Sequence, residues 1–210
     1  EAEGSDAWWG RIALDLGLGG RRGLTPFEVD NSIRLQLFAH LQWDYFDDAE
    51  DTAPGAIVPQ DTYTYGGRLA VRFDALERNL LELPHLGLAA GGVVDLLRRA
   101  DWRPTGLRGP DGERLGPRPD TRDVLRLSGY GYAAFGIPFL SERHRLVAQV
   151  HGGWAPPGTL DRFSAFRFGA GPYQSEANDL GRVAFNRVTF EAITADRYVI
   201  GGLTYRYEVL

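Results

Sequence analysis

Residues 62–75 read TYTYGGRLAVRFDA and alternate between two kinds of side chain without a break. The odd positions are apolar or glycine, whereas the even positions include two threonines, two arginines and an aspartate. A period of two residues predicts a β-strand, which places alternate side chains on opposite faces of a sheet. The segment is also longer than the usual soluble strand of about 5 to 6 residues. Such a strand, apolar on one face and charged on the other, is typical of a transmembrane β-barrel.

The same alternation returns along most of the chain. It is strongest at 32–46, where Phe38 is the one exception, and where Trp43 and Tyr45 end the apolar row as an aromatic girdle does at a membrane interface. For 85–97 a helix is the alternative, although Gly87, Gly91 and Gly92 disfavour it. We therefore predict eight or nine strands, of which closure would use eight or ten, at 8–19, 32–46, 62–75, 85–97, 124–135, 144–154, 163–171, 182–193 and 198–210.

The segments between the predicted strands differ in length and composition. Residues 1–7 form a polar leader, 19–23 (GGRRG) a turn, and 47–60 an acidic loop with two prolines. Residues 98–121 contain four prolines and form the longest predicted loop; a disordered insert is the alternative. Short turns on one side and long loops on the other are expected of a membrane barrel. We expect one domain over 1–210.

Composition limits the possible functions. The 210 residues hold 43% hydrophobic residues but no run of 18, so a transmembrane helix is not expected. A net charge of −5 disfavours nucleic acid as a partner. Without cysteine, and without His-x-x-x-His spacing, no metal or cofactor site is predicted. The chain lacks methionine, which indicates a processed or excised product, and its polar N-terminus fits removal of a signal peptide.

Assigning one face of each strand to the barrel interior yields the candidate functional residues. About eight strands leave room only for side chains, so these charges would form a salt-bridged plug, whereas in a wider barrel they would line a pore. The predicted lumen-facing residues are Arg11, Asp15, Arg34, His40, Asp44, Arg68, Arg72, Asp74, Arg126, Arg145, His151, Arg206 and Glu208, together with Asp95. The predicted lipid-facing residues are Leu35, Leu37, Trp43, Leu69, Val71, Phe73, Tyr205 and Tyr207.

Three stretches in the C-terminal third, RLVAQVHGGW (145–154), LDRFSAFRFGAG (160–171) and RYVIGGLTYRYEV (197–209), add a resemblance. Together they resemble the C-terminal barrel of the bacterial surface-antigen superfamily, whose members insert outer-membrane proteins or secrete partner proteins. The family's Arg-Gly-aromatic loop tip is replaced by Asn-Asp-Leu-Gly-Arg at 178–182. The resemblance therefore implies an outer-membrane barrel but does not carry over insertase activity.

Catalysis has a weak sequence signal. A Ser-His-acid set could be drawn from Ser128, His151 and Asp15 or Asp44, but no Gly-x-Ser-x-Gly elbow is present. Polar residues facing a lumen explain all of these side chains without catalysis. The chain is thus expected to be non-catalytic, with an outer-membrane lipid hydrolase as a remaining alternative.

The sequence therefore predicts a bacterial outer-membrane protein with a structural, anchoring or transport role. Its expected partners are outer-membrane lipid and other proteins of a membrane complex. The main alternative is a soluble β-sandwich or barrel that binds a ligand or a protein. The two differ in whether the face that holds Leu35, Leu69 and Val71 meets lipid or a second sheet.

Overall fold

The computed structural model describes residues 7–25, 31–48, 50, 56–57, 61–78, 83–100, 106–108, 114–115, 122–160, 164–168, 193–207 and 209. Within these ranges the secondary structure consists of β-strands and turns. No helix there is long and apolar enough to cross a membrane.

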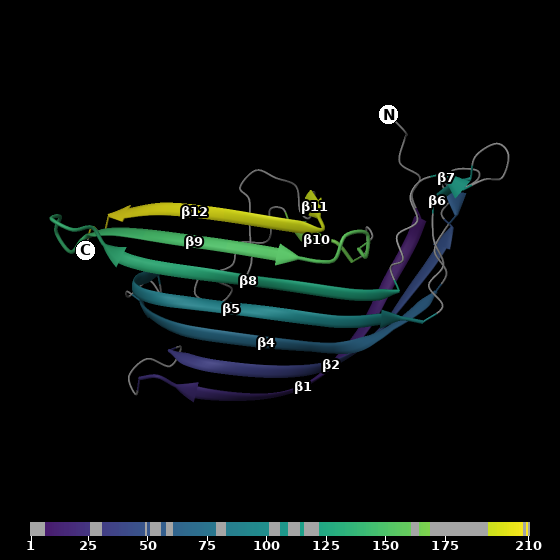
Figure 1. The fold of residues 1–210 in the computed structure, drawn as a ribbon, viewed down its shortest axis with the longest axis horizontal. Helices are drawn as coiled ribbons and strands as arrows, with labels where there is room; N and C mark the ends of the chain where they lie inside the picture. Colours follow the sequence, from purple (N-terminus) through teal and green to yellow (C-terminus); the bar gives the residue numbers. More distant parts are fainter. Residues whose placement is uncertain are drawn as a thin grey trace.

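The main element is an antiparallel sheet whose strands lie side by side in the order in which they occur along the chain (Figure 1). Its order is β1 (Ala7–Gly23), β2 (Ser32–Asp48), β4 (Thr62–Arg78), β5 (Pro84–Arg99), β8 (Asp123–Gly136), β9 (His144–Trp154) and β12 (Arg197–Tyr207). Two small sheets accompany it: β3 (Ala56–Ile57), β6 (Gly106–Arg108) and β7 (Arg114–Leu115) form one, and β10 (Phe166–Phe168) with β11 (Ile193–Ala195) forms the other. The predicted all-β, antiparallel fold is confirmed.

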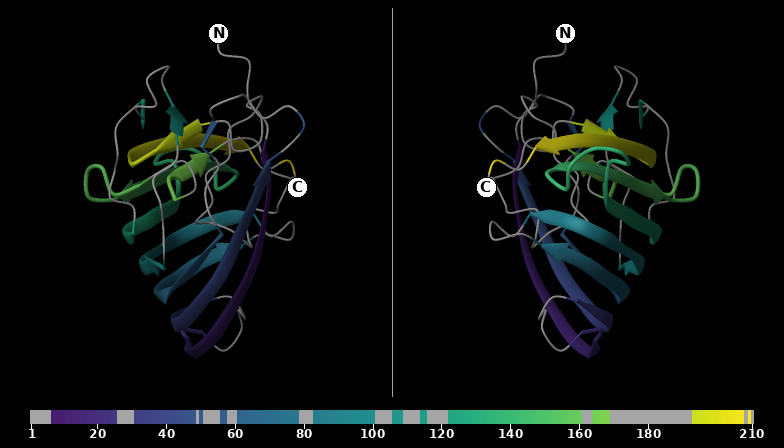
Figure 2. Two further views of the ribbon diagram at one scale, coloured as in Figure 1. Left: turned by 90° about the vertical axis from the view of Figure 1, so that its right-hand side faces the viewer. Right: turned by 90° about the vertical axis from the view of Figure 1, so that its left-hand side faces the viewer.

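The sheet curls strongly, as the views along its strands show (Figure 2). Because the strands alternate in direction, their connections alternate between two ends of the sheet. Connections 24–31, 79–83 and 137–143 share one end, and the longer connections 49–61, 100–122 and 155–196 share the other. We call these the short-loop end and the long-loop end. The predicted asymmetry of loop lengths is therefore present.

The sheet exposes its apolar face and buries its polar face. Leu35, Leu69 and Val71 remain 53%, 40% and 44% exposed, whereas Thr62 and Asp74 on the other face are 1% and 0% exposed. We call the face with the buried polar side chains the inner face and the apolar, exposed face the outer face. Soluble proteins bury apolar residues and almost never bury unpaired charges, so this sheet has the reverse arrangement.

The inner face also holds two small apolar clusters. One consists of Leu76, Ala89, Tyr132, Ala134 and Val147, near the short-loop end. The second joins Val124 of β8 to Ala155 and Leu160, with Leu97 and Phe166 packed against it. Since Ala155 and Leu160 follow β9 at the long-loop end, the chain after β9 turns back onto the inner face.

Several predicted boundaries need correction. The turn expected at 19–23 is wrong: β1 continues to Gly23, because these residues pair with β2 from Gln36 down to Ser32. The helix considered for 85–97 is also wrong, since Pro84–Arg99 is a strand paired with both β4 and β8. The predicted loops contain the short strands β3, β6 and β7.

Among the described residues the main sheet has seven strands, where eight to ten were predicted for the barrel. The strand predicted at 144–154 is confirmed without change. Of the strand predicted at 182–193, only Ile193 lies inside the described residues, as the first residue of β11. Of 163–171, Phe166–Phe168 form β10.

The polar inner face as the candidate functional site

A first polar cluster links the edge strand β1 to β2 on the inner face. Arg11 Nε lies 2.7 Å from Asp44 Oδ1, and Gln42 Nε2 donates to Asp44 Oδ2 at 2.6 Å. His40 connects to the same group, with Nε2 3.2 Å from Gln42 Oε1 and Nδ1 2.6 Å from Asp15 Oδ1. Since alternate residues of a strand share a face, these five side chains form one chain of hydrogen bonds across two strands.

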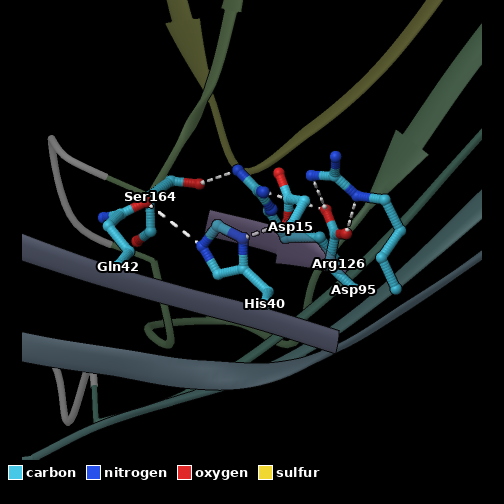
Figure 3. Close-up of polar contacts among 7 residues, drawn as sticks. Asp15, His40, Gln42, Asp95, Arg126 and Ser164 are labelled. Carbon is cyan, nitrogen blue, oxygen red and sulfur yellow. Dashed lines mark hydrogen bonds and ion pairs between the residues drawn. The ribbon is translucent and has the colours of Figure 1, made fainter. Parts of the chain in front are cut away.

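A second cluster spans β4, β5 and β8. The carboxylate of Asp95 accepts from Arg68 Nε at 2.6 Å and from Arg126 Nη2 at 2.8 Å. Arg126 also donates through Nη1 to the Ser164 carbonyl oxygen at 3.0 Å, which ties the segment after β9 to the inner face. Figure 3 shows that Arg126 joins Asp95 to Ser164, and that Asp15, His40 and Gln42 of the first cluster lie close by.

A third cluster surrounds Asp74 at the short-loop end. Asp74 Oδ2 accepts from Arg72 Nη2 and Arg78 Nη2, both at 2.7 Å, and Oδ1 accepts from the Leu76 backbone N–H at 3.2 Å. The carboxylate is fully buried. A buried charge needs this degree of pairing, because an ion without partners in a poorly solvated site is strongly unfavourable.

Further arginines occupy the same end. Arg34 Nε donates to Ser32 Oγ at 3.1 Å, and Arg206 Nη1 donates to the Pro84 carbonyl at 3.3 Å. Arg145 Nη2 contacts His85 Nε2. The interior therefore combines fully paired carboxylates with an abundance of guanidinium groups.

The predicted interior residues whose side chains are described all lie on the inner face, where the three clusters bring most of them together. Arg34, Arg145 and Arg206 line the short-loop end, and His151 is buried beside the ring of Tyr130 at a centroid distance of 6.2 Å. The side chain of Glu208 lies outside the described residues. The predicted lipid-facing residues lie on the outer face, where Trp43 is partly buried and the others are exposed.

Sequence reasoning missed several inner-face residues. Arg78 and Arg99 lie beyond the predicted ends of their strands, although extending the alternation would have included both. Ser164 had no signal in the sequence, because its carbonyl meets Arg126, 38 positions earlier in the chain, only in the folded structure. His85 was also missed, because its contact with Arg145, 60 positions away, depends on strand pairing.

Neither candidate acid of the Ser-His-acid set makes a described contact with His151. Asp15 bonds His40, and Asp44 bonds Arg11 and Gln42, so both carboxylates have partners other than His151. Ser128 is opposite Gly153, two residues beyond His151. Among the described residues, no group of three His, Cys, Asp or Glu side chains is arranged to hold a metal ion.

Comparison with known proteins assigns no family or function to the chain. No protein-family model, no curated protein and no solved structure matches the chain.

Proposed function

We propose that the protein is a non-catalytic β-barrel of the bacterial outer membrane, with a structural, anchoring or transport role. The observation that carries the proposal is the inverted exposure of the sheet. Charged side chains pair on the inner face, while aliphatic side chains stand exposed on the outer face. Such a distribution is favourable where the outer face meets lipid and the inner face meets water or paired charges.

The soluble alternative requires a second sheet against the outer face. Leu35, Leu37, Leu69, Val71 and Phe73 stay between 36% and 58% exposed, so no described part of the chain covers them. Leucines of β1, β5 and β8 extend the same exposed surface. Contiguous apolar patches beyond a few hundred Å² are rare on soluble monomers and mark an interaction surface, and lipid accounts for a patch that follows the strands across the whole sheet.

Two rows of aromatic side chains border this apolar surface. Tyr45, Tyr63, Tyr65 and Trp154 are exposed toward the long-loop end, and Phe73, Phe135, Tyr205 and Tyr207 toward the short-loop end. Trp43 stacks on Tyr63 with ring centroids 6.4 Å apart. From Tyr63 to Phe73 a strand advances about 33 Å, which at a tilt of about 40° is roughly 25 Å along the membrane normal. This matches the apolar band between the aromatic girdles of membrane barrels.

Whether the number of strands is odd or even limits how the barrel can close. With seven strands in an up-and-down order, β1 and β12 run in the same direction, so direct pairing between these edges would be parallel. An entirely antiparallel barrel therefore includes an odd number of further strands between β1 and β12. Open sheet edges are not tolerated in hydrocarbon, because their backbone N–H and C=O groups would lack partners.

A charge at the centre of the outer face tests the proposal. Leu69→Arg places a guanidinium midway between the aromatic rows, and at a bilayer midplane it should destabilise the folded protein by about 2–4 kcal/mol. Glu77→Arg is the matched control near the short-loop rim, where the expected cost is about 0–1 kcal/mol. Folding into vesicles is followed by circular dichroism and by the mobility difference between boiled and unboiled samples on a gel.

If the outer face met water instead of lipid, Leu69 would be an ordinary surface residue and its substitution would change stability by no more than about 0.5 kcal/mol. Equal, small effects of Leu69→Arg and Glu77→Arg, with full solubility of the wild type without detergent, would overturn the membrane proposal.

A further inference from the structure

An open apolar groove of about 660 Å³ crosses β8, β9 and β12 next to the long-loop end. Gly129 and Gly152 are opposite one another in its floor, and neither has a side chain to fill the space. Its walls are Leu127, Trp154 and Val199, which are 37%, 41% and 81% exposed. We call this hollow the glycine groove.

The glycine groove lies on the outer face. Its wall side chains are exposed, whereas His151, which is buried on the inner face at the same level of β9, does not line it. On the neighbouring strand β5, Gly92 is opposite Gly129, so that three glycines form a row across three strands. The next outer-face residues of β8 are Gly131 and Ala133, about 13 Å of strand from Gly129 to Ala133. The depression therefore runs along β8 toward the centre of the sheet, and its shape fits an extended hydrocarbon chain.

Arg197 stands at the mouth of the glycine groove. It is the first residue of β12, is opposite Trp154 and lines the groove. Its Nε donates to the Ala155 carbonyl at 3.4 Å, and none of the ion pairs between described residues includes it. Trp154 belongs to the aromatic row of the long-loop end, where the proposed barrel meets the head-group region. A guanidinium at this depth is level with lipid phosphates, whose oxygens match its planar fork of donors.

We propose that the glycine groove binds one phosphate-bearing lipid from the leaflet at the long-loop end. One acyl chain lies over Gly129 and Gly152, and the phosphate accepts hydrogen bonds from Arg197. This inference rests on the proposed function and deepens it, because it assigns a specific lipid site to a face that otherwise meets bulk lipid. Charge and shape together select the occupant: the groove is apolar along its length and cationic only at its head-group end.

The test adds dimyristoylphosphatidylglycerol to the detergent-folded full chain and follows the thermal midpoint, because a ligand that binds the folded state raises it. Dimyristoylglycerol, which has the same acyl chains but no phosphate, should bind more weakly. Arg197→Gln should weaken binding of the phospholipid by about tenfold and leave binding of dimyristoylglycerol unchanged. Arg98→Gln is the control, because Arg98 is exposed at the same end of β5 and pairs loosely with Asp123 at 3.7 Å.

Filling the floor of the glycine groove tests the acyl-chain contact. A Cβ at Gly152 would meet nothing nearer than the Tyr198 carbonyl oxygen at 3.7 Å, so Gly152→Val should fold and should weaken binding of both lipids. Gly67→Val is the matched control on β4, outside the groove, where a Cβ would lie 3.5 Å from the Phe38 carbonyl oxygen. It should leave both affinities unchanged. Heat-dependent gel mobility verifies that each variant is folded.

Two results would overturn the inference. One is an equal affinity of wild type, Arg197→Gln and Gly152→Val for dimyristoylphosphatidylglycerol. The other is a dimer in sedimentation of the detergent-folded wild type that Gly152→Val dissociates, because the groove would then hold a second copy of the chain.

The two proposals fail in different ways. A protein that folds into vesicles with heat-dependent gel mobility, but whose variants all bind the phospholipid equally, loses the lipid site and keeps the membrane barrel. A wild type that is fully soluble without detergent removes the membrane barrel. Phospholipid binding that still separates Arg197→Gln from Arg98→Gln in that soluble protein would keep the groove as a lipid site.

Discussion

Asp74 and Arg78 form an ion pair within β4, with Arg78 Nη2 2.7 Å from Asp74 Oδ2, and side-chain exposures of 0% for Asp74 and 10% for Arg78. Arg72 Nη2 reaches the same oxygen, and the Leu76 N–H reaches the other. One buried carboxylate therefore holds two guanidinium groups and a backbone donor in place. Removing its charge leaves two partly buried guanidinium groups without this counter-ion.

Asp74→Asn should accordingly lower the free energy of unfolding by about 3–5 kcal/mol, the usual cost of removing one partner of a buried ion pair. The measurement is urea unfolding of the lipid-folded protein, followed by circular dichroism. Asp15→Asn is the control, because the Asp15 side chain is 44% exposed and its pair with His40 should contribute no more than about 1 kcal/mol. Losses of the same size in both variants would contradict the central role of Asp74.

Arg126 should hold the segment after β9 against the sheet. Arg126→Gln removes the hydrogen bond to the Ser164 carbonyl while Asp95 keeps its bonds to Arg68. Amide hydrogen exchange in Ser164–Phe168 should therefore accelerate. Arg68→Gln is matched to it, because Arg68 shares Asp95 but makes no described contact with Ser164, and it should leave exchange in that segment unchanged. Equal acceleration in both variants would refute a specific tie through Arg126.

Gly153 and Gly152 are neighbours in β9 with opposite surroundings. A Cβ at Gly153 would lie 2.1 Å from the ring of Tyr198, which Phe168 contacts at a centroid distance of 4.4 Å and thereby restrains. A Cβ at Gly152 would meet nothing nearer than the Tyr198 carbonyl oxygen at 3.7 Å. Gly153→Ala should therefore cost about 1–3 kcal/mol through overpacking, and Gly152→Ala no more than about 0.5 kcal/mol. The measurement compares the unfolding midpoints of the two variants. A larger loss of stability in Gly152→Ala than in Gly153→Ala would contradict the packing described.

The alternation of residues predicted the local structure well where it was uninterrupted. Leu69, Val71 and Phe73 were placed on one face and Arg68, Arg72 and Asp74 on the other, because a strand has no other way to arrange a period of two. At 19–23 the same reasoning failed. Two glycines and two arginines indicate a turn by local preference, but pairing with β2 satisfies their backbone groups and overrides that preference.

The partners of the inner-face residues could not be predicted in the same way. Asp95 bonds Arg68 and Arg126, which lie 27 and 31 residues away along the chain, and Arg126 also bonds the Ser164 carbonyl. A one-residue change in register would separate these groups and move each strand's charges to the other face. The same registers place Arg34 opposite Arg21 and Arg72.

The sequence by itself determined the strands and the two-faced character of each, because side-chain alternation is a local property of extended backbone. The tertiary structure alone decided which charges meet, where arginines oppose one another and which face is buried. These depend on strand register and on the curl of the sheet, and both arise from long-range backbone pairing that a sequence pattern does not encode.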